Sequence, residues 1–331
     1  MSQVVSLMTA YIFRRLIQTL ILTLALSFVS FALLALMPGD PVDIACQANP
    51  HCTPENLAQM KKNLGLDQPI PVRYGKWLKE ALHGDLGYSR TYRLPVTEIL
   101  APRLMNTFYL SGLSLVLSIT IAIPLGVFTS LRQNTKFDYT LNMLAFAGIS
   151  VPSFWLGLML IIIFAVQLQW LPASGTETIA LDGDLSGVSR AWDRLRYLIL
   201  PVTALSLLTV ASWVRFTRAK MIETMRHDYV RTARAKGLPE RQVILRHGLR
   251  NALIPVITVI ALDFSGLFSG AVITETVFAY QGAGKLMFDA IFANDYHVAM
   301  CSFVITALAV MVMNLVADIL YAYMDPRITY S

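Results

Sequence analysis

The stretch LMNTFYLSGLSLVLSITIAIPLGVFTSL, from Leu104 to Leu131, decides the fold of this chain because no charged side chain interrupts it. A helix needs about 20 mostly apolar residues to cross the hydrocarbon layer of a membrane, and this stretch is longer than that. Hydrophobic residues make up 55% of the 331 residues and charged residues only 15%. This balance is far from that of a soluble domain. The sequence therefore predicts an integral membrane protein.

Five further apolar stretches are separated from one another by charged segments. We expect an all-α fold with about six transmembrane helices. The first span is longer than the core of a signal peptide and lacks a convincing cleavage site, so we expect it to be retained. The expected spans cover residues 11–37, 104–131, 139–168, 197–213, 252–277 and 298–323.

The chain is expected to fall into three parts. Residues 1–37 form an amino-terminal tail and the first span, residues 38–103 form an external loop or cap, and residues 104–331 form the transmembrane core. Within the external loop, the sequence indicates short amphipathic helices that break between Gly65 and Pro71. We interpret this loop as a small cap and not as a separate domain.

The orientation of the chain follows from its charges. The side that holds both termini and the segment 215–250 has a clear excess of Lys and Arg, whereas the opposite side is close to neutral. Since positive charge collects on the cytoplasmic side of membrane proteins, we expect both termini and this segment in the cytoplasm. The net charge of +6 does not indicate nucleic-acid binding, because the basic residues are interleaved between apolar spans.

Segment 215–250 is too charged to cross a membrane, yet it is rich in helix-forming residues. Asp228 suits the N-cap of a short helix that ends near Lys236, and Gly237 suits the left-handed position after a helix. Pro239 can open the next helix. The basic charge of this segment, taken by itself, is typical of a solvated loop that only sets the orientation of the chain in the membrane. The helix signals favour a rigid helix-turn-helix that transmits a push from a partner to the membrane spans.

This segment resembles the EAA signature of bacterial ABC importer permeases, which stands here as RTARAKG from Arg231 to Gly237. With RHGLRNALIP after it, the variant is similar to the dipeptide, oligopeptide and nickel subfamily, and to the first of its two paralogous permeases. Arg231 stands where the signature has Glu, and Tyr280 to Gly282 stand where relatives have an aromatic-Pro-Gly turn. The same resemblance extends to LMPGDP at 36–41, HGDLGYS at 83–89 and AVITETVFAYQGAGKL at 271–286.

The resemblance implies a non-catalytic permease subunit of an ABC importer in the bacterial inner membrane, working by alternating access. It implies a second, paralogous permease, two ATPase subunits that bind ATP and Mg²⁺, and an external solute-binding protein. It also implies a coupling helix that docks on an ATPase subunit. By position, this role falls on Asp228, Arg231, Thr232, Ala233 and Gly237.

The sequence predicts no phosphate-binding loop and no metal site. The run from Gly282 to Lys285 lacks the remaining residues of a P-loop, and the histidines are dispersed. Cys46, Cys52 and Cys301 form neither a zinc ligand set nor a CxxC pair. Cys46 and Cys52 lie in the external loop, where an oxidising compartment permits a disulfide. Their spacing leaves open whether they are bridged.

Acidic residues inside membrane spans are costly unless they face protein or water, which makes Asp263 and Glu275 candidates for the substrate pathway. Asp263 lies inside the fifth expected span, where a carboxylate would attract the amino terminus of a peptide. Glu275 lies near the end of that span, where a structural hydrogen bond is the alternative. Gly266 and Gly270 form a GxxxG pair that admits a close neighbour, either from this chain or from another subunit.

Two other functions fit parts of the sequence. An ion-driven transporter would use Asp263 and Glu275 as titrating groups, but the sequence has no apparent inverted repeat or interrupted helix pair. A non-transporting scaffold would use its basic loop to bind a regulator or anionic lipid. Within the family, the sequence leaves open dipeptides, oligopeptides, nickel chelates, haem, antibiotic peptides and opine-like solutes.

Overall fold

The computed structural model describes residues 2–36, 53–63, 67–178 and 187–324. These residues form helices joined by turns and irregular loops, and no β-strand occurs among them. In chain order the helices are α1 (Ser2–Ala35), α3 (Pro54–Asn63), α4 (Ile70–Leu82), α5 (Val96–Leu131), α6 (Lys136–Ser150), α7 (Ser153–Leu160), η1 (Ile161–Gln167), α8 (Gly187–Met225), α9 (Asp228–Ala235), α10 (Glu240–Gln242), η2 (Val243–Leu249), α11 (Arg250–Val277), α12 (Ala283–Phe292) and α13 (Tyr296–Met324).

Within the described ranges, five helical stretches are long and apolar enough to cross a membrane. The bent pair of α6 with α7 and η1 adds a sixth if it is counted as one span. The prediction of an all-α fold with about six transmembrane helices is therefore confirmed. The five stretches are Phe13–Ala35, Val96–Leu131, Gly187–Met225, Glu240–Phe264 and Tyr296–Ile319.

The third expected span is interrupted by a bend, so the expectation that the chain has no interrupted helix pair was wrong. α6 ends at Ser150 and α7 begins at Ser153, after a bend of 104°. Val151 has an extended backbone with φ −82° and ψ 126°, because the ring of the following Pro152 disfavours the helical conformation in the residue before it. Hydropathy over residues 139–168 does not record the bend, whereas Pro152 was a sequence signal for it that the assignment of spans did not use.

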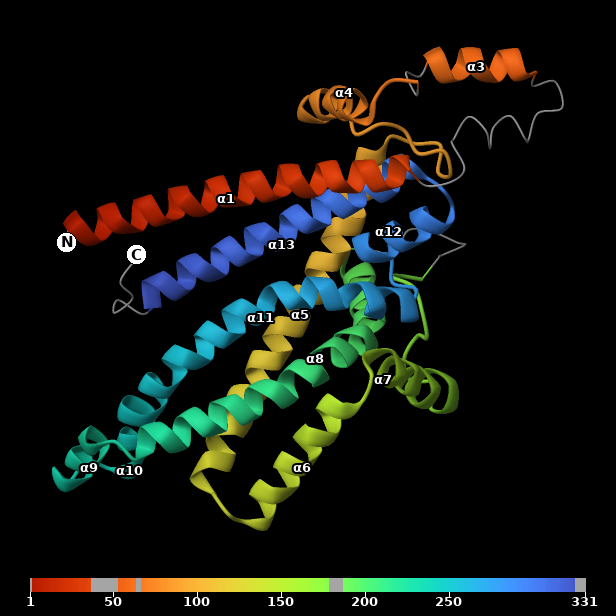
Figure 1. Ribbon diagram of the computed structural model, residues 1–331. Helices are drawn as coiled ribbons and strands as arrows, with labels where there is room; N and C mark the ends of the chain where they lie inside the picture. The colour runs from red at the N-terminus through yellow and green to blue at the C-terminus, as the bar shows by residue number, and fades with distance from the viewer. Residues whose placement is uncertain (1, 37–52, 64–66, 179–186, 325–331) are drawn as a thin grey trace. The chain divides into compact units, whose positions relative to one another are not determined.

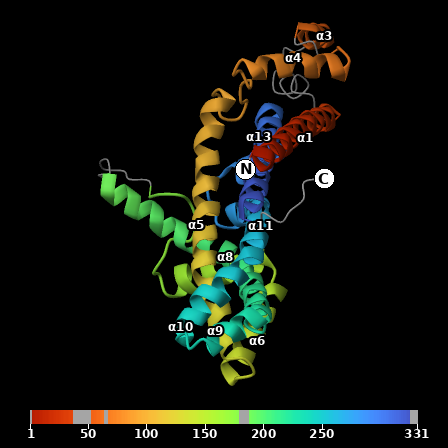
Figure 2. The ribbon, with the colours of Figure 1, turned by 90° about the vertical axis from the view of Figure 1, so that its left-hand side faces the viewer.

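The helices form two compact units, and the larger is built mainly from residues 107–281. In this unit α8 packs against α6, α7 and α11, and Figures 1 and 2 show α8 and α11 side by side. α5 also approaches α8 closely at Gly126. A Cβ atom on Gly126 would lie 2.6 Å from the Cβ atom of Thr217 and 2.9 Å from the carbonyl oxygen of Val214. Only glycine allows this approach.

The smaller unit contains residues 13–106 and 282–309. Here α4 packs on α1, where the Tyr74 hydroxyl lies 2.7 Å from Ser27 Oγ and Trp77 is buried beside Phe31. The loop after α4 is held by Asp295, just before α13. The carboxylate of Asp295 accepts hydrogen bonds from Ser89 Oγ at 2.6 Å and from the Thr91 amide at 3.0 Å. The short helices expected after the first span are confirmed as α3 and α4.

Candidate functional site

The segment after α8 carries the predicted coupling role, and we call residues 226–242 the α9–α10 element. α8 continues to Met225, well beyond its apolar part, before the chain turns. His227 is the N-cap of α9 and Asp228 is its first helical residue, so the expected N-cap is displaced by one position. Asp228 still places an acidic charge at the positive end of the helix dipole. α9 then ends at Ala235, as the helix signals predicted to within one residue.

A small apolar cluster holds the α9–α10 element together. Val230 and Ala233 of α9 are buried against Val243 of η2, with Met225 and Leu238 at the edge. Ala233 was expected to take part in docking by its position in the motif. Its side chain instead points into this cluster, 4% exposed, so its direct contribution is to the packing of α9.

The turn between α9 and α10 is set by Gly237 and closed by an ion pair. Gly237 has φ +75°, a left-handed conformation that glycine adopts at no steric cost. Arg234 then donates from Nε and Nη2 to the two carboxylate oxygens of Glu240, at 3.1 and 2.7 Å. This contact holds the pKa of the Arg234 guanidinium above its ordinary value. The angle between the two short helices is therefore defined by local geometry.

The outer face of α9 is polar and open. Asp228 and Arg231 are 95% and 74% exposed, and Arg231 Nη1 lies 3.5 Å from Asp228 Oδ1. Thr232 is exposed beside them and donates to the backbone carbonyl of Asp228 at 2.9 Å. An ion pair this exposed contributes little to stability. These three side chains are available for contact with another molecule.

The carboxyl-terminal part of α8 is fastened to α6 by Arg218 and Asp138. Arg218 donates from Nε to Asp138 Oδ1 and from Nη2 to Oδ2, both at 2.6 Å. Asp138 is buried and also accepts from the amide of Asn134 at 3.0 Å and from Asn142 Nδ2 at 2.8 Å. With its lone pairs satisfied in this way, the buried carboxylate is stable in its charged form. A displacement of the α9–α10 element is thus coupled to α6 as well as to α8.

Asp263 lies on α11 within the apolar span and is exposed in the single chain. Its Oδ2 atom accepts a hydrogen bond of 2.8 Å from Nε1 of Trp213, a side chain of α8 that is 1% exposed. A Cβ atom on Gly266, three residues further along α11, would meet nothing within 4 Å. The structure therefore holds one carboxylate oxygen in place beside an open helix surface.

Glu275 is placed differently. Its side chain is fully buried and accepts a hydrogen bond of 2.5 Å from Thr107 Oγ1 of α5. This arrangement matches the structural alternative raised for Glu275, since the carboxylate joins two helices inside the packing. The possible bridge between Cys46 and Cys52 lies outside the described residues. Cys301 is buried and has a free thiol.

Sequence reasoning missed Trp213, Asp138 and Arg218. Trp213 was counted only as the end of a span, and the charged pair was counted only in the orientation of the chain. One signal was available: Asp138 is the single acidic residue between the second and third expected spans. A lone acid in a basic turn next to the membrane indicates a specific partner, although the partner lies far away in the sequence.

Comparisons with protein families place the chain beside membrane transport proteins. Residues 122–330 match the family described as binding-protein-dependent transport system inner membrane component. Residues 8–111 match the family of the amino-terminal part of these components. Together the two matches cover most of the chain.

Individual relatives agree over their full length. The chain is 40% identical over 324 residues to the oligopeptide transport system permease protein AppB of Bacillus subtilis, covering 98% of this chain and 100% of the relative. It is 37% identical over 335 residues to the dipeptide transport system permease protein DppB of Alkalihalophilus pseudofirmus, with the same coverage. A solved inward-facing structure of the MetNI methionine ABC transporter matches with a TM-score of 0.56 and 15% identity, covering 69% of this chain and 97% of the other.

Proposed function

From the premise that this chain belongs to the family of binding-protein-dependent transport system inner membrane components, and is a transmembrane permease subunit of an ABC importer, we propose that it carries peptides. The observation that carries the substrate class is the full-length similarity to permeases named for oligopeptides and dipeptides, at 40% and 37% identity. Short peptides share a charged amino terminus, a charged carboxylate and a polar backbone. A pathway for them needs fixed polar groups within an otherwise apolar membrane.

Asp263 is the residue that we assign to the substrate pathway. It is exposed within a membrane span, and a lone acidic residue at such depth is stable only when it faces water or protein. The Trp213 indole holds Oδ2, and the carboxylate keeps further acceptor sites for the ammonium group of a peptide. Glu275 is left out of this assignment because its carboxylate is enclosed between α5 and α11.

The α9–α10 element is proposed to dock on an ATPase subunit in the cytoplasm. The excess of basic residues in segment 215–250 supports the cytoplasmic orientation, which also places both termini there. The open face of Asp228, Arg231 and Thr232 would form the contact. Gly237 would set the angle of this face, and Ala233 would support it from the small apolar cluster.

We further propose the composition of the transporter. Two ATPase subunits bind ATP and Mg²⁺, a second and paralogous permease pairs with this chain, and an external binding protein delivers the peptide. The exposed surface of α11 around Gly266 supports a close neighbour in this span. ATP-driven closure of the ATPase subunits would push on the α9–α10 element, and the element would pass the motion to α8 and α6.

Uptake by a reconstituted transporter tests this proposal. The chain would be purified with its co-purifying subunits, placed in proteoliposomes, and supplied with ATP and labelled dipeptide, oligopeptide or nickel chelate. ATP-dependent accumulation of a peptide is the expected result. Accumulation driven by a proton or sodium gradient without ATP would overturn the assignment in favour of an ion-driven carrier. Accumulation of the nickel chelate alone would overturn the substrate class and leave the importer assignment intact.

A further inference from the structure

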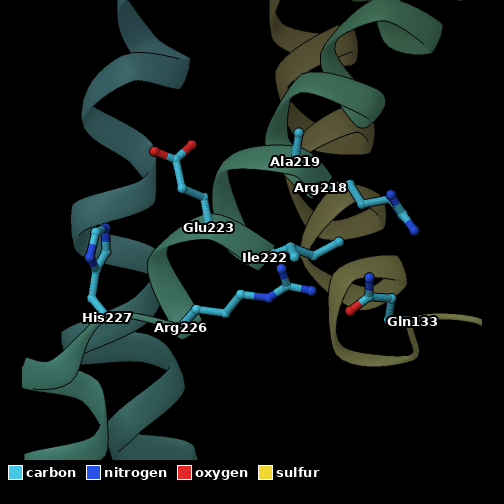
Figure 3. A pocket seen from close by; sticks show the side chains of 7 residues that line it. All are labelled: Gln133, Arg218, Ala219, Ile222, Glu223, Arg226 and His227. Atoms are coloured by element: carbon cyan, nitrogen blue, oxygen red, sulfur yellow. The ribbon is translucent and has the colours of Figure 1, made fainter.

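A groove of about 570 Å³ lies beside the end of α8, between this helix and the turn that follows α5. Gln133 lines it from the turn, Arg218 and Ile222 line it from α8, and Arg226 lines it from the first position after α8. In Figure 3 the guanidinium groups of Arg218 and Arg226 and the amide of Gln133 face the same space. The groove therefore combines these three donor side chains with the apolar side chains of Ala219 and Ile222, and Glu223 and His227 complete its lining.

The charges around the groove do not cancel. Arg218 is neutralised by Asp138, and Glu223 is neutralised by Lys220, whose Nζ atom lies 2.8 Å from Glu223 Oε2. Arg226 has no ion-pair partner within the described parts of the chain. The pair with Asp138 occupies Nε and Nη2 of Arg218, and a guanidinium carries further N–H donors. The groove thus has one uncompensated positive charge and several free donors, which suits an anion.

Aromatic and basic side chains next to Gln133 are of the kind found at the level of lipid headgroups. Phe128 and Phe137 are exposed and pack against each other with ring centroids 5.2 Å apart. The guanidinium of Arg132, next to Gln133, lies 4.2 Å from the centroid of the Phe128 ring. Exposed aromatic rings covered by a basic side chain are typical of the boundary between hydrocarbon and headgroups. Phe137 precedes Asp138, the partner of the groove residue Arg218, so an acyl chain beside Phe137 would have its phosphate near the groove.

We propose that this groove binds the phosphate of an anionic phospholipid of the inner leaflet, with Arg226 as the principal cation and Gln133 and Arg218 as additional donors. The choice of leaflet rests on the proposed orientation of the chain. Basic pockets between membrane helices on the cytoplasmic side bind acidic headgroups. The lipid would join the α5–α6 turn to the end of α8 and to Arg226, the first residue of the α9–α10 element, and would steady the segment that transmits motion.

Two other anions have the chemistry to bind these donors. The test therefore has to distinguish each of them from a bound lipid. Free inorganic phosphate has the same chemistry but no acyl chain. An acidic segment of an ATPase subunit would reach the groove from the water side. Of the three ligands, only a lipid would bind in a way that depends on headgroup charge in the bilayer. Only a lipid would also stay bound when the other subunits are absent.

Lipid retention by the full-length chain is the experiment that tests the proposal. The chain would be placed in nanodiscs of phosphatidylcholine containing a minor fraction of phosphatidylglycerol, and the lipids kept after mild detergent extraction would be counted by native mass spectrometry. Arg226→Gln should lower the retention of phosphatidylglycerol about fivefold, the effect expected of one basic residue at an anionic surface. Arg250→Gln, an exposed change of equal charge outside the groove, should leave retention unchanged.

Each other outcome would overturn the proposal. Equal losses in the Arg226 and Arg250 variants would mean diffuse attraction to charge. Displacement of the lipid by millimolar inorganic phosphate would mean a free-phosphate site. Loss of co-purifying ATPase with unchanged lipid retention in Arg226→Gln would mean a protein contact. Because retention is measured without transport, failure here and failure of peptide uptake are separate results.

Discussion

Arg218 and Asp138 form a bidentate ion pair in which both hydrogen bonds are 2.6 Å long. This pair joins the end of α8 to the start of α6. The carboxylate side chain is 2% exposed and the guanidinium side chain 22%, so the pair is largely removed from water. Arg218 belongs to the last part of α8, the helix that leads into the α9–α10 element. The effects of changes in this region therefore depend on whether one or both charges are removed.

Removal of one partner should be more harmful than removal of both. Asp138→Ala leaves the Arg218 charge without its partner and should lower the free energy of unfolding by about 3 kcal/mol. The double variant Asp138→Ala with Arg218→Met buries no unpaired charge and should recover most of this loss. Thermal unfolding of the purified chain in detergent measures both effects. A double variant less stable than Asp138→Ala would show that the two residues do not act as a pair.

Substitutions at Gly237 should separate backbone strain from side-chain bulk. A Cβ atom there would meet nothing within 4 Å, so size alone is tolerated, whereas φ +75° disfavours most residues by about 1–2 kcal/mol. Gly237→Val should shift the turn and reduce the amount of co-purifying ATPase, because a β-branched side chain is poorly accommodated at positive φ. Gly237→Asn should retain the ATPase, since asparagine adopts this conformation readily. Equal retention by both variants would contradict the role of the turn angle.

Asp263 should discriminate peptides by their amino terminus if it lines the pathway. Asp263→Asn removes the negative charge and should lower the uptake of a dipeptide with a free ammonium group about tenfold, the loss of one charge-assisted hydrogen bond. The smaller uptake of the N-acetylated analogue should not change. Trp213→Phe removes the indole donor and should give an intermediate loss by loosening the carboxylate. A uniform loss for both peptides would indicate a structural role for Asp263.

Asp295 should hold the loop after α4 in a fixed conformation. In Asp295→Ala the buried Ser89 hydroxyl and the Thr91 amide lose their acceptor. A lost buried hydrogen bond costs about 1–3 kcal/mol, so hydrogen exchange at the Thr91 amide should accelerate about tenfold or more. Glu98→Gln, an exposed change of one acidic residue in the same unit, is the matched control. Unchanged exchange in Asp295→Ala would show that the loop is held by other contacts.

Tyr280 should make the protein sensitive to alkaline pH. Burial, reinforced by the charge of Glu275, raises the pKa of its phenol above the ordinary value. The unfolded chain ionises near pH 10, whereas the folded chain keeps the proton, so stability falls as pH rises above about 10. Tyr280→Phe should flatten this part of the decline in unfolding temperature between about pH 9 and 11. An identical decline in the variant would mean that other groups cause it.

Hydropathy and helix signals in the sequence were sufficient for the class of protein, the approximate number of spans and the position of the short helices α9 and α10. These features depend only on residues that are close together in the chain. An apolar run long enough for a bilayer marks a span, Gly237 marks the end of one helix, and Pro239 marks the start of the next. The motif from Arg231 to Gly237 also indicated the family, and full-length relatives confirm it. The docking and pathway roles assigned to particular residues stay predictions.

The sequence by itself thus determined that the chain is a helical membrane permease and which segment is polar enough to meet a partner. Only the tertiary structure decided that Glu275 is enclosed by Thr107, that Asp263 remains open beside Trp213, and that Asp138 joins Arg218. The sequence distinguishes these two acids only by their position along the span, because hydropathy treats every carboxylate equally. Their environments differ because the packing of α5, α8 and α11 determines which helix face each acid meets.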